Sequence, residues 1–302
     1  MGSIRMATIA EVLSRMEDWK GKEVQIQELT AGLTNSNYKV TVDNMSYVVR
    51  IPGHGSDIFI NRDVELHNTL SASKVGVGAH VYYFFESDYV IVSEFLSGST
   101  MSIERFRGNR DTIVRTVEAI KQVNTKGEFT SEFIMFNKFD DYMAIVKQNS
   151  IRVPAGFDTG EKVVNRVRER FMTSMPELVS CHNDLLAENF IDQGDRMRII
   201  DWELSGLNDV CFELGDFSVE QGFSEEEDRL IVETYFGSFI EQKFARINIY
   251  KYMADMLWTL WAVIQNHFSK HDFDYWGYGM NRFNRAMDAF HTDDFSRWLE
   301  IA

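Results

Sequence analysis

Two acidic sites lie close together in the segment Val179–Glu203, and each stands beside a hydrophobic run. Asp184 follows the first run and has Asn189 five residues further on, whereas Asp201 ends the second run. Phosphoryl transfer from a metal–nucleotide complex needs a carboxylate that orients the attacking hydroxyl and oxygen ligands that hold Mg²⁺ on the phosphates. The segment therefore predicts this chemistry, with Asp184 as catalytic base and Asn189 and Asp201 as metal ligands.

The neighbours of these three residues have predicted supporting roles. We expect His182 to brace the loop by hydrogen bonding and Trp202 to contribute packing, whereas Glu203 could either approach the metal or brace its loop. The apolar runs Phe190-Ile191 and Met197–Ile200 predict a hairpin that fixes both metal ligands, with a polar turn between them. Any one of the acidic residues alone would fit an ordinary surface loop, but their order and setting favour phosphoryl transfer.

The first 97 residues are predicted to form a small lobe built on an antiparallel sheet. Apolar periodicity and turn residues indicate a helix at Ile9–Trp19, two strands within Val24–Val42 joined by a turn at Ala31–Asn37, a strand at Ser46–Ile51, a helix at Asn61–Ser73, and a strand hairpin at Val81–Phe85 and Tyr89–Phe95. Period-two alternation with few helices is typical of such a sheet-based lobe.

A larger, mainly helical lobe is predicted for residues 98–302. The small polar break Ser97–Ser99 is a plausible hinge. Helical patterns cover Asp111–Asn124, Phe139–Gln148, Glu161–Met172 and most of the chain from Glu225 onward. The fold class expected is therefore α+β with two lobes and a cleft between them.

The charge of the chain restricts its partners. Its 302 residues carry a formal net charge of -15, whereas nucleic-acid binding needs clustered Lys and Arg, so we expect no nucleic-acid partner. An acidic protein needs Mg²⁺ and local basic groups to hold the anion ATP, and its overall field favours a cationic substrate.

Cysteine usage and hydropathy suggest a cytoplasmic location. Cys181 and Cys211 have no CxxC spacing and are predicted to be reduced and structural. No apolar run reaches membrane-spanning length, and the amino terminus lacks the apolar core of a signal peptide. We therefore expect no membrane insertion; the oligomeric state does not follow from the sequence.

Basic and polar residues of the amino lobe are candidates for nucleotide binding. Asn35 and Ser36 lie in the turn that follows Gly32, where hydrogen-bond donors could meet phosphate, although an ordinary polar hairpin turn fits equally well. Arg50 ends a strand and could pair with the α- and β-phosphates. Its expected partner is Glu65 on the following helix, with Asp63 as second choice.

The strand end before the hinge supplies the last predicted nucleotide contacts. Backbone groups of Glu94 and Phe95 are expected to meet the adenine edge. No Walker loop is present, which argues against the P-loop class of kinase.

A run of aromatic residues near the carboxyl end is the candidate acceptor site. Trp258 and Trp261 are three residues apart, so they share one face of a helix, and Tyr275 and Tyr278 follow. Aromatic residues at this spacing most often form core. Their faces can also bind a quaternary ammonium, each contributing about 0.5–2 kcal/mol.

The central segment resembles the choline and ethanolamine kinases and, more distantly, the aminoglycoside phosphotransferases, which share a two-lobed protein-kinase-like fold. Their motif, H-N-D and a later Asn followed by I-D-W/F-E, corresponds to His182, Asn183, Asp184, Asn189, Asp201, Trp202 and Glu203. The resemblance implies ATP as cosubstrate and Mg²⁺ as cofactor. Choline kinases resemble this chain in having Arg at the position of Arg50.

The aromatic run resembles choline kinases as well. Their WxxWxxxQ helix and later tyrosine pair correspond to Trp258, Trp261, Gln265, Tyr275 and Tyr278, and the resemblance implies that the Trp and Tyr residues wall a choline pocket.

By the same resemblance Glu220 lies near the choline nitrogen, where a carboxylate supplies charge complementarity, although an exposed helical glutamate is the alternative. The chain departs from the family at Glu213, commonly Asp, and at Asp216, commonly Asn, and we expect both changes to affect loop bracing.

The leading prediction is ATP-dependent phosphorylation of choline, giving phosphocholine and ADP. A kinase for ethanolamine or an aminoglycoside is the first alternative, but a primary ammonium favours hydrogen-bond acceptors over aromatic walls. A catalytically silent choline-binding protein is the second alternative; the intact Asp184, Asn189 and Asp201 argue against it.

Overall fold

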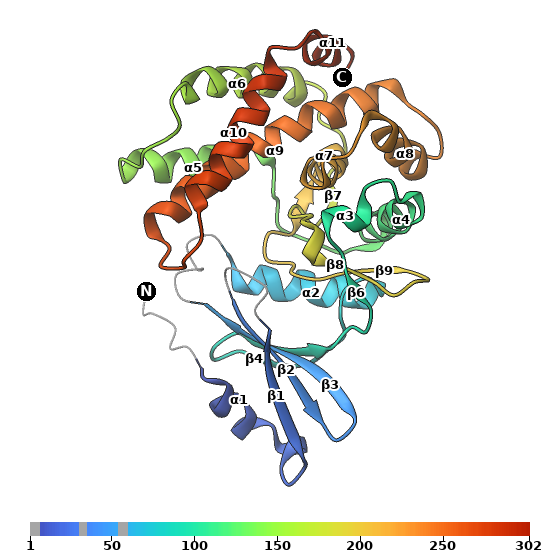
Figure 1. The fold of residues 1–302 in the computed structure, drawn as a ribbon, viewed down its shortest axis with the longest axis vertical. Helices are drawn as coiled ribbons and strands as arrows, with labels where there is room; N and C mark the ends of the chain where they lie inside the picture. Colours follow the sequence, from blue (N-terminus) through green and yellow to red (C-terminus); the bar gives the residue numbers. More distant parts are fainter. Residues whose placement is uncertain (1–6, 30–34, 54–59) are drawn as a thin grey trace.

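A five-stranded antiparallel sheet with strand order β1-β2-β3-β5-β4 forms the amino-terminal part of the chain (Figure 1). The structure, a computed structural model, describes residues 7–29, 35–53 and 60–302. The elements of this part are α1 (Ile9–Arg15), the 3-10 turn η1 (Glu17–Trp19), β1 (Val24–Leu29), β2 (Asn35–Val42), β3 (Met45–Pro52), α2 (Arg62–Val75), β4 (Val81–Phe85) and β5 (Val90–Glu94).

Alternation along β3 explains how this sheet presents a charged side chain. Val49 and Ile51 are buried in a small core with Val12 and Trp19. Because successive strand residues point to opposite faces, Arg50 points away from that core and meets Glu65 on α2. Strand alternation within SYVVRI therefore determines which face of the sheet carries the Arg50 side chain.

The chain leaves the first sheet after Glu94 and enters a second, three-stranded sheet at Ser99. This sheet contains β6 (Ser99–Thr100), β8 (Phe190–Asp192) and β9 (Met197–Ile199), and a two-stranded sheet pairs β7 (Val179–Cys181) with β10 (Gly206–Asn208). The predicted hairpin is confirmed as β8–β9. Its turn is fixed by Gly194, whose N–H donates to Asp192 Oδ1 at 2.9 Å and whose φ is 90°.

Helices make up most of the rest of the chain. They are α3 (Ile103–Phe106), α4 (Arg110–Lys126), α5 (Met135–Gln148), α6 (Phe157–Met172), the 3-10 turn η3 (Ala187–Asn189), α7 (Val210–Gln221), α8 (Glu225–Phe236), α9 (Glu241–Phe268), α10 (Tyr275–Phe290) and α11 (Asp293–Ile301). In Figure 1 the long α9 lies among α5, α7 and α10. The predicted α+β architecture, a small antiparallel sheet and a larger helical part, is confirmed.

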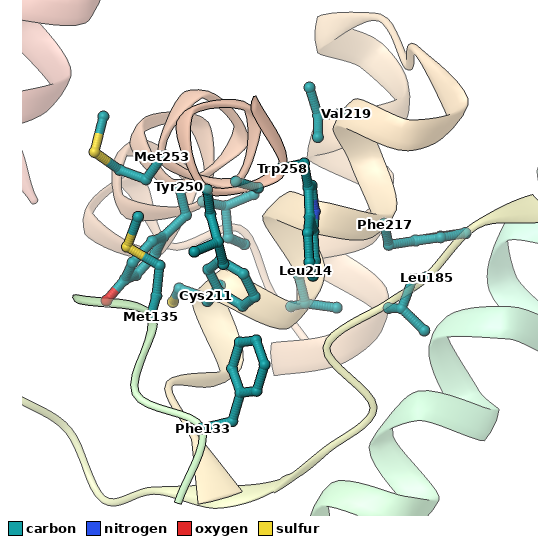
Figure 2. Packing of buried hydrophobic residues seen from close by; sticks show 14 of the residues in the cluster. Phe133, Met135, Leu185, Cys211, Leu214, Phe217, Val219, Tyr250, Met253 and Trp258 are labelled. Atoms are coloured by element: carbon teal, nitrogen blue, oxygen red, sulfur yellow. The ribbon is translucent and has the colours of Figure 1, made fainter. Parts of the chain in front are cut away.

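The main core forms where α7 packs against α9. Figure 2 shows Leu214 and Phe217 of α7 beside Trp258, with Tyr250 nearby. Almost every residue of α7 is buried, the acidic Glu213 and Asp216 included. This burial makes α7 a fixed base for the loop that precedes β8.

Several predicted boundaries were wrong. Asn35 and Ser36 belong to β2, paired with β3, and are not part of a turn. Tyr89 and Phe95 lie outside β5, and α5 and α6 each begin four residues earlier than expected, at Met135 and Phe157. Among the described residues, no helix combines the length and apolar character needed to cross a membrane.

Candidate active site

Two buried carboxylates of α7 hold the loop that contains Asp184. Glu213 accepts the backbone N–H groups of His182 and Asn183, each at 2.8 Å. Asp216 accepts the N–H of Leu185, also at 2.8 Å. Both positions were expected to affect the bracing of this loop, and both side chains brace it.

His182 connects the base to the second acidic site. Its Nε2 donates to the carbonyl of Ile200 at 2.8 Å, while Nδ1 accepts the N–H of Asp184 at 3.3 Å. Burial lowers the pKa of His182 to about 4, so the ring is neutral and can both donate and accept. Its ring also contacts Trp202, with centroids 4.7 Å apart. The predicted bracing role of His182 and packing role of Trp202 are confirmed.

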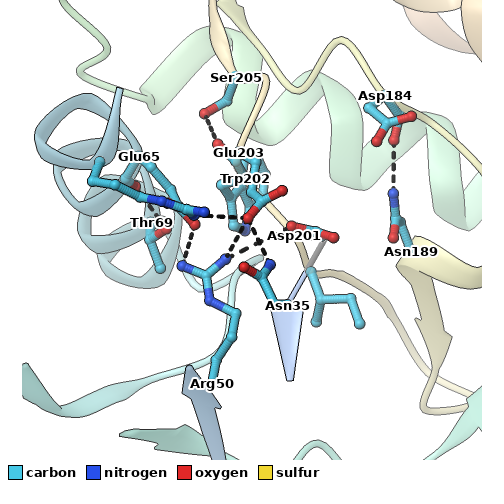
Figure 3. A network of polar contacts seen from close by, with 12 residues as sticks. Asn35, Arg50, Glu65, Thr69, Asp184, Asn189, Asp201, Trp202, Glu203 and Ser205 are labelled. Carbon is cyan, nitrogen blue, oxygen red and sulfur yellow. Dashed lines mark hydrogen bonds and ion pairs between the residues drawn. The ribbon is translucent and has the colours of Figure 1, made fainter. Parts of the chain in front are cut away.

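Asp184 and Asn189 lie at the two ends of this loop (Figure 3). Asn189 Nδ2 donates to the backbone carbonyl of Asp184 at 2.9 Å, which orients the amide of Asn189. Burial raises the pKa of Asp184 well above its ordinary value, and the nearby Asp216 and Asp201 raise it further. A carboxylate with a raised proton affinity among other acids suits a general base.

Asp201 has the features of a cation ligand. It adopts a left-handed backbone, φ 67°, and its Oδ1 is buried without a hydrogen-bond partner. The nearest cation is Arg50, whose Nη1 is 3.7 Å from Oδ1. Burial and the neighbouring Glu203 raise the pKa of Asp201 to about 7. A half-buried carboxylate beside other acids, whose Oδ1 accepts no hydrogen bond from the described residues, fits a hard cation.

The described residues contain no cluster of three or more His, Cys, Asp or Glu that could form a metal site alone. This is compatible with Mg²⁺, which is commonly held by one or two protein ligands together with phosphate oxygens and water. Asp201 and the amide oxygen of Asn189 are the protein groups that would hold it.

Arg50 stands in a network of alternating charges that joins the two parts of the chain (Figure 3). It forms an ion pair with Glu65, the partner predicted from the sequence. Arg62 Nη1 lies 2.7 Å from Glu65 and 2.8 Å from Glu203. Asn35 Nδ2 donates to Glu203 at 2.6 Å. Glu65 and Glu203 thus hold the two arginines between the sheet and the segment after β9.

This network shows Glu203 in one of its two predicted roles, that of a brace, whereas contact with the metal stays a prediction. Burial opposes its ionisation, but Arg50 and Arg62 outweigh burial and hold the pKa of Glu203 below its ordinary value. Glu203 is therefore an ionised brace between strand β2 and the acidic segment. Asp63, the second-choice partner of Arg50, is exposed at the start of α2.

The structure places the other nucleotide-side candidates in the first sheet or at its end, and their predicted contacts with the nucleotide stay predictions. The Asn35 side chain binds Glu203, while Gly32 lies outside the described residues. The Phe95 N–H donates to Ser46 O at 3.3 Å, so this N–H is already used within the protein. The Glu94 carboxylate accepts from His80 N at 3.2 Å and Arg198 Nη2 at 3.3 Å. Ser36 lies in β2 opposite Ile51, and its predicted contact with phosphate stays a prediction.

The two tryptophans of α9 have different surroundings. Trp258 is 5% exposed in the main core, and its Nε1 donates to Asp216 Oδ1 at 2.8 Å. We predicted it as a pocket wall, but its indole packs in the core and supports the carboxylate that braces the loop. Trp261 is half-buried, with ring centroids 5.8 Å from Tyr275 and 5.9 Å from Tyr278. Trp261 is therefore the better candidate for an aromatic wall.

Substitution of the two tryptophans should separate these roles. Trp258→Ala should destabilise the fold by about 3–5 kcal/mol, because it removes a large core side chain and a buried hydrogen bond. Trp261→Ala should leave stability nearly unchanged and raise the KM of the acceptor by about tenfold, with little change in the KM of ATP. Denaturant unfolding and steady-state kinetics measure these effects. Equal rises in both KM values for Trp261→Ala would contradict the wall.

Glu220 is buried at the end of α7, and its carboxylate lies against Arg282 of α10. Arg282 Nη2 lies 2.7 Å from Glu220 Oε1 and 2.5 Å from Oε2. The charge that faces Glu220 is thus supplied by the protein. Glu220 also contributes to the raised pKa of Asp184, after burial, Asp216 and Asp201.

Three residues of this region were missed in the sequence. Arg62 and Arg282 bind carboxylates 141 and 62 residues away, and no local pattern indicates such pairs. Phe273 lies two residues before Tyr275, with ring centroids 4.8 Å apart, and could have been recognised as part of the aromatic run.

Comparison with known proteins identifies the family of this chain. The choline/ethanolamine kinase family profile matches residues 26–235. A crystal structure of a choline/ethanolamine kinase family protein from Mesorhizobium loti is 33% identical, covers 96% of each chain and has a TM-score of 0.85. Ethanolamine kinase 1 of Mus musculus is 28% identical over 320 residues, which cover 88% of this chain and 84% of that protein.

Two structures of LicA are also similar. Choline kinase LicA from Streptococcus pneumoniae is 25% identical, with a TM-score of 0.78, over 92% of this chain and 96% of that chain. The structure of LicA in complex with AMP is 26% identical, with a TM-score of 0.73, over 96% of this chain and 97% of that chain.

The fold extends beyond these relatives. Spectinomycin phosphotransferase is only 12% identical, but it covers 99% of this chain and 97% of its own, with a TM-score of 0.60. The predicted resemblance and the two-lobed protein-kinase-like fold are confirmed. This chain belongs to the choline/ethanolamine kinase family and is a phosphotransferase with an alcohol group as acceptor.

Proposed function

We propose that the chain transfers the γ-phosphate of ATP to the hydroxyl of choline, giving phosphocholine and ADP. The observation that carries the proposal is that one hydrogen-bonded loop presents Asp184 and Asn189 while His182 ties it to the segment of Asp201. Base and metal ligands therefore hold a fixed relation to one another, which phosphoryl transfer requires.

In this proposal the protein acts mainly by orienting the reactants. Asp184 accepts the proton of the acceptor hydroxyl, so that the oxygen can attack the γ-phosphorus. Arg50, held by Glu65, steadies the phosphate groups. Asn189 and Asp201 would hold Mg²⁺, which when bound would supply positive charge that stabilises the phosphate groups. The AMP bound in the LicA complex supports an adenine nucleotide as phosphate donor.

The choice of choline rests on the attraction between the aromatic cluster and the permanent positive charge of the trimethylammonium group. The rings of Trp261, Tyr275, Tyr278 and Phe273 lie close together, with neighbouring centroids 4.8–5.9 Å apart. Such rings favour a trimethylammonium, which has no N–H to donate. Ethanolamine is the second candidate, since ethanolamine kinase 1 is among the similar proteins.

An initial-rate assay of ADP release tests the proposal. It uses ATP and Mg²⁺ with choline, ethanolamine or an aminoglycoside, and with no acceptor as control. We expect the highest kcat/KM with choline. A higher value with ethanolamine would replace choline as substrate, and the absence of acceptor-dependent release with every compound would favour a silent binding protein.

A further inference from the structure

The guanidinium of Arg282 lies in the region where the ammonium group of the acceptor is expected to bind. Arg282 is 9% exposed, and its Nη2 lies within hydrogen-bond distance of both Glu220 oxygens. Its Cζ lies 3.6 Å from the ring centroid of Tyr278, a cation–π distance. Within the described part of the chain the buried Nε of Arg282 has no hydrogen-bond partner, whereas Glu220 and Tyr278 both contact the guanidinium.

This group is close to both the aromatic cluster and the base. Tyr278 contacts Trp261 and Phe273 through its ring, with centroids 5.9 and 5.8 Å away. Glu220 is near enough to Asp184 to affect its ionisation. Arg282 therefore contacts two groups of the proposed acceptor site, the carboxylate of Glu220 and one face of Tyr278.

The pairing of Glu220 with Arg282 affects the binding of primary ammonium groups and of trimethylammonium groups differently. A primary ammonium carries three N–H donors and binds best where a carboxylate has free acceptor sites, because charge-assisted hydrogen bonds are the strong ones. Glu220 already accepts from Arg282 with both oxygens and has its charge offset. A trimethylammonium donates no hydrogen bond and loses little from this pairing, since it binds aromatic faces and the remaining negative field.

We propose that Arg282 is a specificity-determining residue, which withholds Glu220 from primary ammonium groups and so makes the pocket rank acceptors by their N-methylation. The inference rests on the proposed function. Arg282 acts through Glu220 and Tyr278 and is a positioning residue.

A methylation series tests this role. Ethanolamine, N-methylethanolamine, N,N-dimethylethanolamine and choline are each assayed for kcat/KM with wild type and Arg282→Met, which keeps an unbranched apolar stem. We expect the choline-to-ethanolamine ratio to fall by about tenfold or more in Arg282→Met, because the freed carboxylate gains charge-assisted bonds with ethanolamine. The KM of ATP should stay within about twofold, since these contacts do not reach the nucleotide groups.

Two further variants separate specificity from folding. Glu220→Gln/Arg282→Met replaces the ion pair by neutral groups of similar size. The choline-to-ethanolamine ratio of kcat/KM for this double variant should return towards the wild-type value. Asp255→Asn/Arg285→Met is the matched control, because Arg285 lies one turn further along α10 and pairs with Asp255 at 2.5 Å. It should change thermal stability without changing the ratio.

The outcomes are distinct. An unchanged ratio in a folded Arg282→Met protein would overturn the inference while leaving the kinase activity intact. Should Arg282→Met fail to fold, Arg282→Gln takes its place, with the same expected direction and the same contradicting result. Wild-type protein inactive on the whole series would instead refute the proposed function.

Discussion

Replacing Asp184 with asparagine should lower kcat by about 10²–10⁴-fold and leave the affinity for ATP nearly unchanged. The amide is close in shape to the carboxylate, and the loop is held through backbone groups by Glu213 and Asp216, so the fold should survive. The lost function is acceptance of the hydroxyl proton. Steady-state kinetics and nucleotide titration measure the two quantities separately.

Glu188→Gln is the matched control for this variant. Glu188 is an exposed carboxylate four residues after Asp184, on the same loop. Its removal changes the local charge by the same amount without removing a proton acceptor, so kcat should stay within about threefold of wild type. A large loss in Glu188→Gln, or near-normal turnover in Asp184→Asn, would remove Asp184 as base.

Asp201→Asn should abolish most of the Mg²⁺ dependence of ATP binding and lower kcat by about 10²-fold or more, because the charged group proposed to bind the metal becomes neutral. Asparagine is the suitable replacement, since it tolerates the left-handed backbone that Asp201 adopts, φ 67°. Alanine would add backbone strain to the loss of the ligand. Calorimetric titration of ATP with Mg²⁺ and with EDTA measures the effect.

Asp192→Asn provides the comparison for the metal site. Asp192 ends β8 in the same hairpin and pairs with Arg115 at 2.8 Å. Its substitution should weaken the hairpin slightly and leave the metal dependence of ATP binding unchanged. If Asp201→Asn retains wild-type metal dependence, Asp201 is not a ligand.

Local pattern was sufficient for the parts of the site that each element positions by itself. The sequence placed Arg50 at the end of a strand and Glu65 on the following helix, and the structure pairs the two. The apolar runs around Gly194 predicted the β8–β9 hairpin, because turn geometry fixes its register.

The contacts that escaped prediction depend on tertiary arrangement. Spacing placed Trp258 and Trp261 on one face of α9, but that helix is buried on most sides, so spacing alone could not tell which indole packs in the core. Likewise, the sequence suggested the charge of Glu220 without indicating that Arg282 on another helix offsets it. Buried ion pairs between segments that are far apart in the sequence produce no periodic pattern from which they could be predicted.

Competition between acceptors tests the central account most directly. Wild-type protein is incubated with ATP, Mg²⁺ and equal concentrations of choline and ethanolamine, and the phosphorylated products are quantified by mass spectrometry alongside Asp184→Asn. The account predicts phosphocholine as the main product and almost no product with Asp184→Asn. The amounts of phosphocholine and phosphoethanolamine should together equal the amount of ADP formed. A predominance of phosphoethanolamine, or ADP formation without any phosphorylated alcohol, would contradict it.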